Sequence, residues 1–251
     1  MCGISGWAGA PDPEAATRMS VALRHRGPDG QGRWNDAHAT LLHERLSIID
    51  VAGGHQPMTN EDGRLQIVFN GEIYNYRELR AELEARGHRF ATRSDTEVIL
   101  HLYEEAGERC PERLLGMFAF AVWDTREETL FLARDRLGIK PLFYAEAGER
   151  LLFASEMKAL LAHGGVGREV DPQGLDHYLT FMYVPAPGTI LRGVRKLLPG
   201  HSLTWRAGKL LLRRYWALPE ADEMPCEGSE AEAAEELAAL LQEAVRCRLM
   251  S

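Results

Sequence analysis

An α+β fold built from antiparallel sheets is predicted for this chain. The region from Met117 to Phe153 contains four short apolar segments, MFAFAVWD, TLFLARD, KPLFYA and RLLFAS, with polar or glycine-containing breaks between them. Helical patterns lie before and after this strand-rich region, not between its strands. Helices that do not alternate one-to-one with strands favour a layered α+β arrangement over βαβ units.

The N-terminal half is expected to hold three strands and two helices. Residues 1–10 form a glycine-rich apolar segment, and glycine within a strand often marks the close approach of another backbone or a ligand. Residues 39–50 and 64–70 have the composition of further strands. Helices are predicted to start at Asn75 and Ser94, each of which has a glutamate three residues later, as in a capping box.

The second half begins with the four strands already described, which suit an antiparallel meander. A short helix is predicted over 155–164, ending on a glycine, and another from Asp171 to about Phe181. Residues 201–216 are predicted to form a hairpin that turns at Ala207 and Gly208.

The C-terminal segment differs in composition from the rest. Residues 217–230 are rich in Pro, Gly and Glu, which is typical of a linker. The following residues predict an amphipathic helix whose apolar stripe needs a partner surface. The stripe consists of Ala234, Leu237, Leu241, Ala244 and Val245.

Charge and cysteine content restrict the function classes. The net charge of −8 argues against nucleic-acid binding, which needs a basic face. The chain has no apolar run of about eighteen residues and its start does not resemble a signal peptide, so no membrane association is expected. The four cysteines match neither zinc-site spacing nor a secreted disulfide framework. We therefore expect no metal site and a reducing, cytoplasmic setting.

Cys2 is a candidate nucleophile. Removal of Met1 would leave a thiol and a free α-amine on one residue, with reference pKa values near ~8.5 and ~8. The amine can then accept the thiol proton directly or through one water, so this nucleophile needs no histidine. A cysteine at the second position can equally be a chance member of a buried strand, so Cys2 alone is weak evidence for a catalytic nucleophile.

Five further motifs accompany Cys2. They are RHRGPDG at 24–30, HERLSIID at 43–50, NGEIYN at 70–75, SDTEVIL at 94–100 and SEMKALL at 155–161. From Cys2 to about residue 215 the chain resembles, motif by motif and in the same order, the glutaminase domain of the class II glutamine amidotransferases of the asparagine synthetase type.

The resemblance implies a fold and a domain division. The fold is the N-terminal nucleophile (Ntn) hydrolase four-layer αββα sandwich with antiparallel sheets. Residues 1–216 would form the glutamine amidotransferase type-2 domain. Residues 217–251 would be a linker and the first helix of an ATP-dependent synthetase domain. The nucleotide-binding loop expected of such a domain is not found in this sequence.

The resemblance also assigns roles to residues. Arg45 would bind the α-carboxylate of glutamine, since a guanidinium offers two parallel donors. Asn70 and Gly71 would donate to the oxyanion formed when Cys2 attacks. Glu72 and Asp95 would bind the α-ammonium. The backbone expected to line the same pocket is that of Leu46, Ser47, Ile48 and Ile49.

The implied reaction is hydrolysis of L-glutamine through a Cys2 thioester, with the ammonia used for ATP-dependent asparagine synthesis from aspartate. No cofactor is expected for the glutaminase half, whereas ATP and Mg are expected for the synthetase domain. That domain would be the partner of the glutaminase half, and a homodimer is left open. Three alternatives stay open: an amidotransferase with a different acceptor, a non-catalytic glutamine-binding module, and an Ntn acylase or protease acting on other amides.

Overall fold

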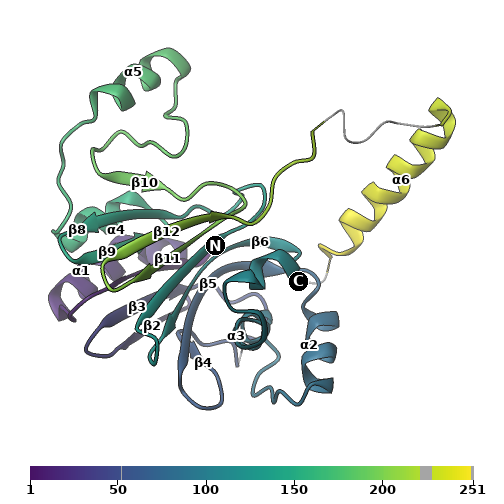
Figure 1. Cartoon of the computed structure of the whole chain (residues 1–251), viewed down its shortest axis with the longest axis horizontal. Coiled ribbons are helices and arrows are strands. Elements are labelled where there is room, and N and C mark those ends of the chain that lie inside the picture. The colour runs from purple at the N-terminus through teal and green to yellow at the C-terminus, as the bar shows by residue number, and fades with distance from the viewer. Residues whose placement is uncertain (52, 221–227, 250–251) are drawn as a thin grey trace.

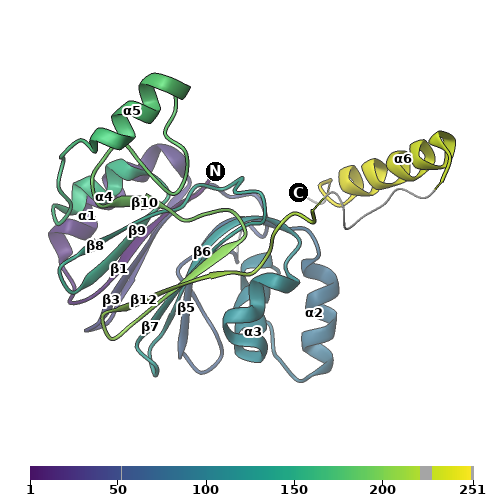
Figure 2. The same cartoon turned by 45° about the horizontal axis from the view of Figure 1, so that its top comes forward.

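Two six-stranded antiparallel sheets pack face to face in the computed structural model, which describes residues 1–51, 53–220 and 228–249 (Figures 1 and 2). The first sheet has the order β10-β8-β9-β1-β3-β2. Its strands in chain order are β1 (Gly3–Ala8), β2 (Gly30–Asn35), β3 (Ala39–Arg45), β8 (Phe143–Ala147), β9 (Arg150–Ala154) and β10 (Val194–Lys196). The second sheet has the order β12-β11-β7-β6-β5-β4. Its strands are β4 (Met58–Thr59), β5 (Leu65–Ile73), β6 (Gly116–Asp124), β7 (Thr129–Arg134), β11 (His201–Arg206) and β12 (Lys209–Arg214).

Helices cover the outer faces of both sheets, and one helix projects away from them (Figure 1). Helices α1 and α4 lie on the first sheet, α2 and α3 on the second, and α5 lies beyond the first. Their bounds are α1 (Pro13–Leu23), α2 (Tyr76–Ala85), α3 (Asp95–Ala106), α4 (Met157–His163), α5 (Pro172–Phe181) and α6 (Glu230–Arg246), with short 3-10 turns η1 (Arg24–Arg26) and η2 (Gly107–Arg113). None of these helices is long and apolar enough to cross a membrane.

Three buried clusters correspond to the three interfaces of a four-layer sandwich. One joins α1 and α4 to the first sheet and includes Trp7 and Leu160. The second lies between the sheets and includes Ile4 and Trp123. The third joins the second sheet to α2 and α3. The predicted four-layer αββα arrangement is confirmed by this layering and by the structural neighbours described below.

Close packing explains the glycine content of β1. A Cβ on Gly6 would lie 2.2 Å from the carbonyl oxygen of Thr40 in β3 and 2.9 Å from the ring of Phe153. Since β1 is central in its sheet, with β3 and β9 on its two sides, any larger side chain there would push a neighbour away. Cys2 directly precedes this strand, so the position of β1 in the sheet fixes the position of Cys2.

The predicted four-strand meander is wrong in one respect. All four strands form, but β6 and β7 pair in the second sheet while β8 and β9 pair in the first. The segment between Arg134 and Phe143 crosses from one sheet to the other. Apolar alternation marks a strand without specifying which sheet it joins, because both inner faces need the same side chains.

Several local predictions also needed correction. The segment with Asn70 and Gly71 lies inside β5, which continues to Ile73 because β6 pairs with it over its whole length. Helix α1, which starts at an Asp12 side-chain cap followed by proline, was not predicted. Strand β2 was also not predicted, because its sequence GQGRWN lacks apolar alternation.

The two predicted capping boxes form only in part. At Asn75 the side chain bonds to Arg113 and Leu115 instead of capping α2. Ser94 caps α3 by accepting from the Thr96 amide, but Glu97 bonds to loop amides rather than to Ser94. The hairpin turn at Ala207 and Gly208 is confirmed, with positive φ at both residues, as a two-residue type I′ turn requires.

Residues 221–227 of the predicted linker 217–230 lie outside the described part of the chain. Residues 217–220 are exposed and have no regular structure. Helix α6 forms with a complete capping box between Ser229 and Glu232. Its stripe leucines Leu237 and Leu241 are 57% and 58% exposed, so none of the described residues covers the apolar face.

Candidate active site

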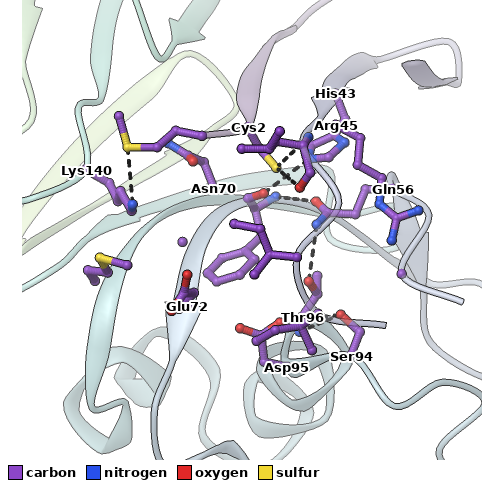
Figure 3. A pocket seen from close by; sticks show the side chains of 18 residues that line it. Cys2, His43, Arg45, Gln56, Asn70, Glu72, Ser94, Asp95, Thr96 and Lys140 are labelled. Carbon is purple, nitrogen blue, oxygen red and sulfur yellow. Dashed lines mark hydrogen bonds between the residues drawn. The ribbon is translucent and has the colours of Figure 1, made fainter. Parts of the chain in front are cut away.

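A cavity of about 190 Å³ lies where the N-terminal end of β1, the end of β3, the open edge of β5 and the start of α3 meet (Figure 3). Of the predicted site residues, nine line it: Cys2, Arg45, Leu46, Ile48, Ile49, Asn70, Gly71, Glu72 and Asp95. These residues come from four separate segments of the sequence, and the fold brings them to one place.

Cys2 is held at the cavity by its backbone and its sulfur. The Arg26 guanidinium donates to the Cys2 carbonyl at 2.9 Å and to the Glu156 carboxylate at 2.8 Å, which links motif 24–30 to motif 155–161. The Leu46 amide donates to Cys2 Sγ at 3.4 Å, and Sγ lies 3.5 Å from the Leu46 carbonyl oxygen. Burial raises the pKa of the Cys2 thiol, so proton removal requires a base.

The first residue lies over the same cavity. Lys140 Nζ donates to the sulfur of Met1 at 3.3 Å. Met1 acylates the α-amine of Cys2, so the chain with Met1 in place lacks the amine that would serve as the base.

The side chain of Lys140 is placed by a loop built around two charged residues. The carboxylate of Asp135 accepts the amides of Phe118, Leu137, Ile139 and Lys140. The guanidinium of Arg134 donates to the carbonyls of Gly138, Lys140 and Leu197. Lys140 itself is only 5% exposed, and burial lowers the pKa of its ammonium. The loop therefore brings a buried cation into the cavity near Cys2.

Arg45, at the end of β3, is oriented by the loop that follows it. Its guanidinium donates to the carbonyl oxygens of Asp50 at 2.7 Å and Val51 at 3.0 Å. The side chain is 6% exposed and lines the cavity. Because a guanidinium carries five N–H donors, three remain for a ligand. The geometry is compatible with the predicted binding of a carboxylate.

Ser47 departs from the prediction that its backbone lines the pocket. Its amide donates to the Asp29 carboxylate at 2.8 Å, and Ser47 is not part of the cavity wall. The Asp29 amide in turn donates to the Arg45 carbonyl. The turn at 24–30 thus holds the loop after β3 through two hydrogen bonds, and the Ser47 amide is no longer available to a ligand.

Asn70 and Gly71 present donors to the cavity from β5. Among the described residues, the buried Nδ2 of Asn70 has no hydrogen-bond partner. The Phe69 amide donates to the Gln56 side chain and the Ile73 amide to Asp95, so alternate amides of β5 point away from β6. Gly71 lies between these two residues, and its amide shares that direction.

The glycine at position 71 has a packing reason as well. A Cβ there would lie 2.2 Å from the Met117 carbonyl oxygen of the neighbouring strand β6. Gly71 therefore lets two strands approach closely while its amide faces the cavity. Two donors, one from a side chain and one from the backbone, are available for an oxyanion.

Acidic groups line the opposite end of the cavity, as Figure 3 shows. Asp95, in the first turn of α3, accepts the Ile73 amide at 3.0 Å. Burial, together with the nearby charge of Glu72, raises the pKa of Asp95 to about 6. A ligand ammonium placed between Glu72 and Asp95 would favour the ionised form of Asp95.

Several cavity residues were not found from the sequence, among them His43, Gln56 and Lys140. His43 donates from Nε2 to the Phe69 carbonyl, and burial lowers its pKa to about 3, so the ring is neutral. Gln56 accepts from the Phe69 amide and donates to Thr96, which ties β5 to α3. His43 belongs to the motif at 43–50 but was assigned no role there, whereas Gln56 and Lys140 belong to none of the recognised motifs and reach the cavity only through the fold.

The family follows from comparison with known proteins. A family model described as a glutamine amidotransferase domain matches residues 1–216. The chain belongs to this family. The amidotransferase motifs recognised in the sequence therefore lie within one matched domain.

Curated relatives of this amidotransferase chain are asparagine synthetases. Glutamine-hydrolysing asparagine synthetase 3 of Bacillus subtilis is 44% identical over 224 residues, covering 86% of this chain and 36% of the relative. Glutamine-hydrolysing asparagine synthetase 1 of the same organism is 40% identical over 244 residues, covering 96% and 38%. A putative glutamine-hydrolysing asparagine synthetase of Mycobacterium tuberculosis is 41% identical over 271 residues, covering 98% and 41%. The chain thus spans well under half the length of these relatives.

Solved structures support the fold of the amidotransferase domain. The glutamine phosphoribosylpyrophosphate amidotransferase of B. subtilis, complexed with ADP and GMP, matches with a TM-score of 0.63 at 22% identity. The match covers 86% of this chain and 49% of that chain. At this identity the likeness shows the fold alone.

Proposed function

We propose that this amidotransferase domain hydrolyses L-glutamine to glutamate and ammonia, with Cys2 as the nucleophile. The observation that carries the proposal is the cavity shared by Cys2, the Gly71 backbone amide and the side-chain Nδ2 of Asn70, which has no partner among the described residues. A nucleophile beside two convergent donors is the arrangement that acyl transfer requires.

The binding end of the cavity suits a free α-amino acid. The Arg45 guanidinium has donors left for the α-carboxylate, and Glu72 and Asp95 offer negative charge for the α-ammonium. Glutamine held by both groups extends its side-chain amide toward Cys2. An acylase or protease acting on peptides would have no use for opposite charges at these positions.

The reaction requires the mature N-terminus. After Met1 is removed, the Cys2 amine takes the thiol proton, and the sulfur attacks the amide carbon while Asn70 and Gly71 stabilise the oxyanion. The proton passes to the leaving nitrogen, ammonia departs and a γ-glutamyl thioester remains on Cys2. Water, deprotonated by the same amine, then attacks the thioester and releases glutamate. No cofactor takes part in these steps.

The ammonia is proposed to serve ATP-dependent asparagine synthesis from aspartate. The support is the names of the relatives, of which this chain covers 36 to 41%. The partner would be a synthetase domain, with which ATP and Mg are expected, and residues 217–251 would connect to it. We propose a cytoplasmic setting, since a catalytic thiol needs reducing conditions.

A glutaminase assay with a matched pair of variants tests the proposal. Cys2→Ala should abolish ammonia release from glutamine and leave the melting temperature nearly unchanged. Cys247→Ala, which removes a half-buried thiol at the end of α6, should retain full activity. Undiminished turnover in Cys2→Ala would refute the assignment. Glutamine binding without turnover in the processed parent chain would favour a non-catalytic glutamine-binding module.

A further inference from the structure

Two histidines that do not line the candidate active site meet beside α3. His101, on α3, has a fully buried side chain, and His88 follows the end of α2. Their ring centroids lie 4.9 Å apart. Both rings turn the same nitrogen, Nδ1, toward one oxygen of Glu104: the distances to Oε2 are 2.8 Å for His101 and 3.5 Å for His88.

A second carboxylate completes the group. Oε2 of Glu61, from the loop between β4 and β5, lies 3.6 Å from His101 Nδ1. Ligand atoms of Glu61, His88 and His101 all lie within 4.8 Å of one another. In a tetrahedral zinc site with bonds of about 2.1 Å, neighbouring ligand atoms are about 3.4 Å apart. The distances of 2.8, 3.5 and 3.6 Å between donor atoms given above lie on both sides of that value.

Three of the four ligands are hydrogen-bonded through their other polar atom, and the exception is His101, whose buried Nε2 has no hydrogen-bond partner among the described residues. His88 Nε2 pairs with Glu105 at 3.0 Å, and His101 Nε2 lies 3.7 Å from Glu97. On the carboxylates, Asn60 donates to Glu104 Oε1 at 2.7 Å and the Arg89 amide donates to Glu61 Oε1 at 3.0 Å. Metal-ligating histidines usually have a carboxylate on their second nitrogen, and ligating carboxylates are themselves hydrogen-bonded. The three hydrogen bonds restrain the orientation of His88, Glu104 and Glu61.

We propose that His88, His101, Glu104 and Glu61 form a binding site for a zinc-class divalent cation. Imidazole and carboxylate donors suit zinc, cobalt and nickel, whereas an all-oxygen site would suit magnesium or calcium. The cation would neutralise carboxylates and tie together the β4–β5 loop, the end of α2 and α3. Because α3 begins at Asp95, which lines the cavity, the site would brace the substrate-binding end of the domain without touching substrate.

The competing state of this cluster is a proton on His101. Burial lowers its pKa, but the hydrogen bond to Glu104 and the nearby carboxylates of Glu97 and Glu61 outweigh burial and raise the pKa to about 9. A protonated His101 among carboxylates needs no metal. The experiment therefore has to measure metal binding directly.

The test uses the full chain in a Cys2→Ala background, so that the nucleophile cannot bind the ion and activity plays no part in the readout. After EDTA treatment, titration calorimetry with Zn²⁺ should show one ion per chain with a Kd of about 1 μM or below. Co²⁺ should give the visible absorption of a four-coordinate N/O site without thiolate-to-cobalt bands. Zn²⁺ should also raise the melting temperature of the chain.

Variants locate the site. His88→Asn should abolish the tight binding and the thermal shift, and Asn60→Ala, behind Glu104, should weaken binding by about 10–100-fold. His38→Asn is the matched control, because His38 also faces a glutamate, Glu128, at 3.7 Å but has no second histidine there. Glu61→Gln, at a side chain that is 43% exposed, covers the case in which His88→Asn misfolds.

Two results would overturn the proposal. One is the absence of stoichiometric binding, with His101 titrating as an ion-paired imidazolium. The other is Zn²⁺ binding that persists unchanged in both His88→Asn and Glu61→Gln. Neither result bears on glutamine hydrolysis, which the Cys2→Ala comparison tests separately.

Discussion

The Lys140 ammonium is hydrogen-bonded to the sulfur of Met1 at 3.3 Å, so the initiator residue lies in the wall of the cavity that holds Cys2. This contact and the blocked Cys2 amine both disappear when Met1 is removed. Processing therefore changes the base, the charge and the shape of the site together.

The first prediction is that active protein begins at Cys2. A chain in which an added N-terminal residue prevents exposure of the Cys2 amine should lose about 10²–10⁴ in glutamine turnover, the usual contribution of a general base. Intact-mass measurement paired with the glutaminase assay checks this. Full turnover by chains that demonstrably retain Met1 would exclude the amine as the base.

The second prediction separates substrate binding from chemistry. Arg45→Lys keeps the positive charge but loses the two parallel N–H donors of the guanidinium group. Because charge-assisted hydrogen bonds contribute about 1.5–3 kcal/mol each, KM should rise by about one to two decades. Asn70→Ala removes a donor that has no partner in the resting site, so it should lower kcat by about 10²–10³ with little change in KM.

Stability controls are needed for Arg45, because lysine also loses the bonds to the Asp50 and Val51 carbonyls. Arg33→Lys, at an exposed arginine on β2, serves as the matched control and should change neither constant. The assignment of roles is wrong if Asn70→Ala acts on KM and Arg45→Lys on kcat.

The third prediction concerns pH. Burial raises the pKa of Asp95 to about 6, so lowering the pH from 7 to 5 protonates it and removes one partner of the substrate ammonium. KM for glutamine should rise over this interval. In Asp95→Asn, KM should be high throughout and lack this dependence on pH.

The folded state should become more stable as the pH falls, even though the affinity for glutamine decreases. The folded state holds the Asp95 proton more tightly than the unfolded state, whose pKa is near 3.8. The contribution of Asp95 to stability therefore increases as the pH falls from about 6 toward 3.8. A KM that rises only together with global unfolding would contradict the role of Asp95 in binding.

The fourth prediction concerns the C-terminal segment. A chain ending at residue 220 keeps Tyr215, whose hydroxyl donates to the Arg134 carbonyl at 2.6 Å, and loses α6 with its exposed leucines. Glutaminase kcat should be nearly unchanged, and the melting temperature should shift by less than about 4 °C, the equivalent of about 1 kcal/mol in a domain of this size.

Any self-association of the full chain should decrease after this truncation, because the exposed stripe on α6 is the surface that would drive it. Light scattering of the two chains at equal concentration provides the measurement. Loss of glutaminase activity on truncation would place residues 221–251 within the catalytic domain, contrary to the predicted division at residue 216.

Local signals in the sequence determined the elements whose ends depend on nearby residues. The start of α3 at Ser94, the end of α4 at Gly164 and the turn at Ala207 and Gly208 all follow from caps or turns a few residues long. The position of Cys2 directly after Met1 likewise needs no fold to be recognised. The motif resemblance, which runs from Cys2 to about residue 215, supplied the layers and the residue set.

Tertiary structure alone decided which distant segments meet. It divided four similar strands between two sheets, directed the Ser47 amide to Asp29 and brought Lys140 over the cavity. It also brought His88 against His101, a pair with no recognisable spacing in the sequence. Short-range propensities do not encode such contacts, because their energies come from packing and desolvation of groups that are neighbours only after the chain has folded.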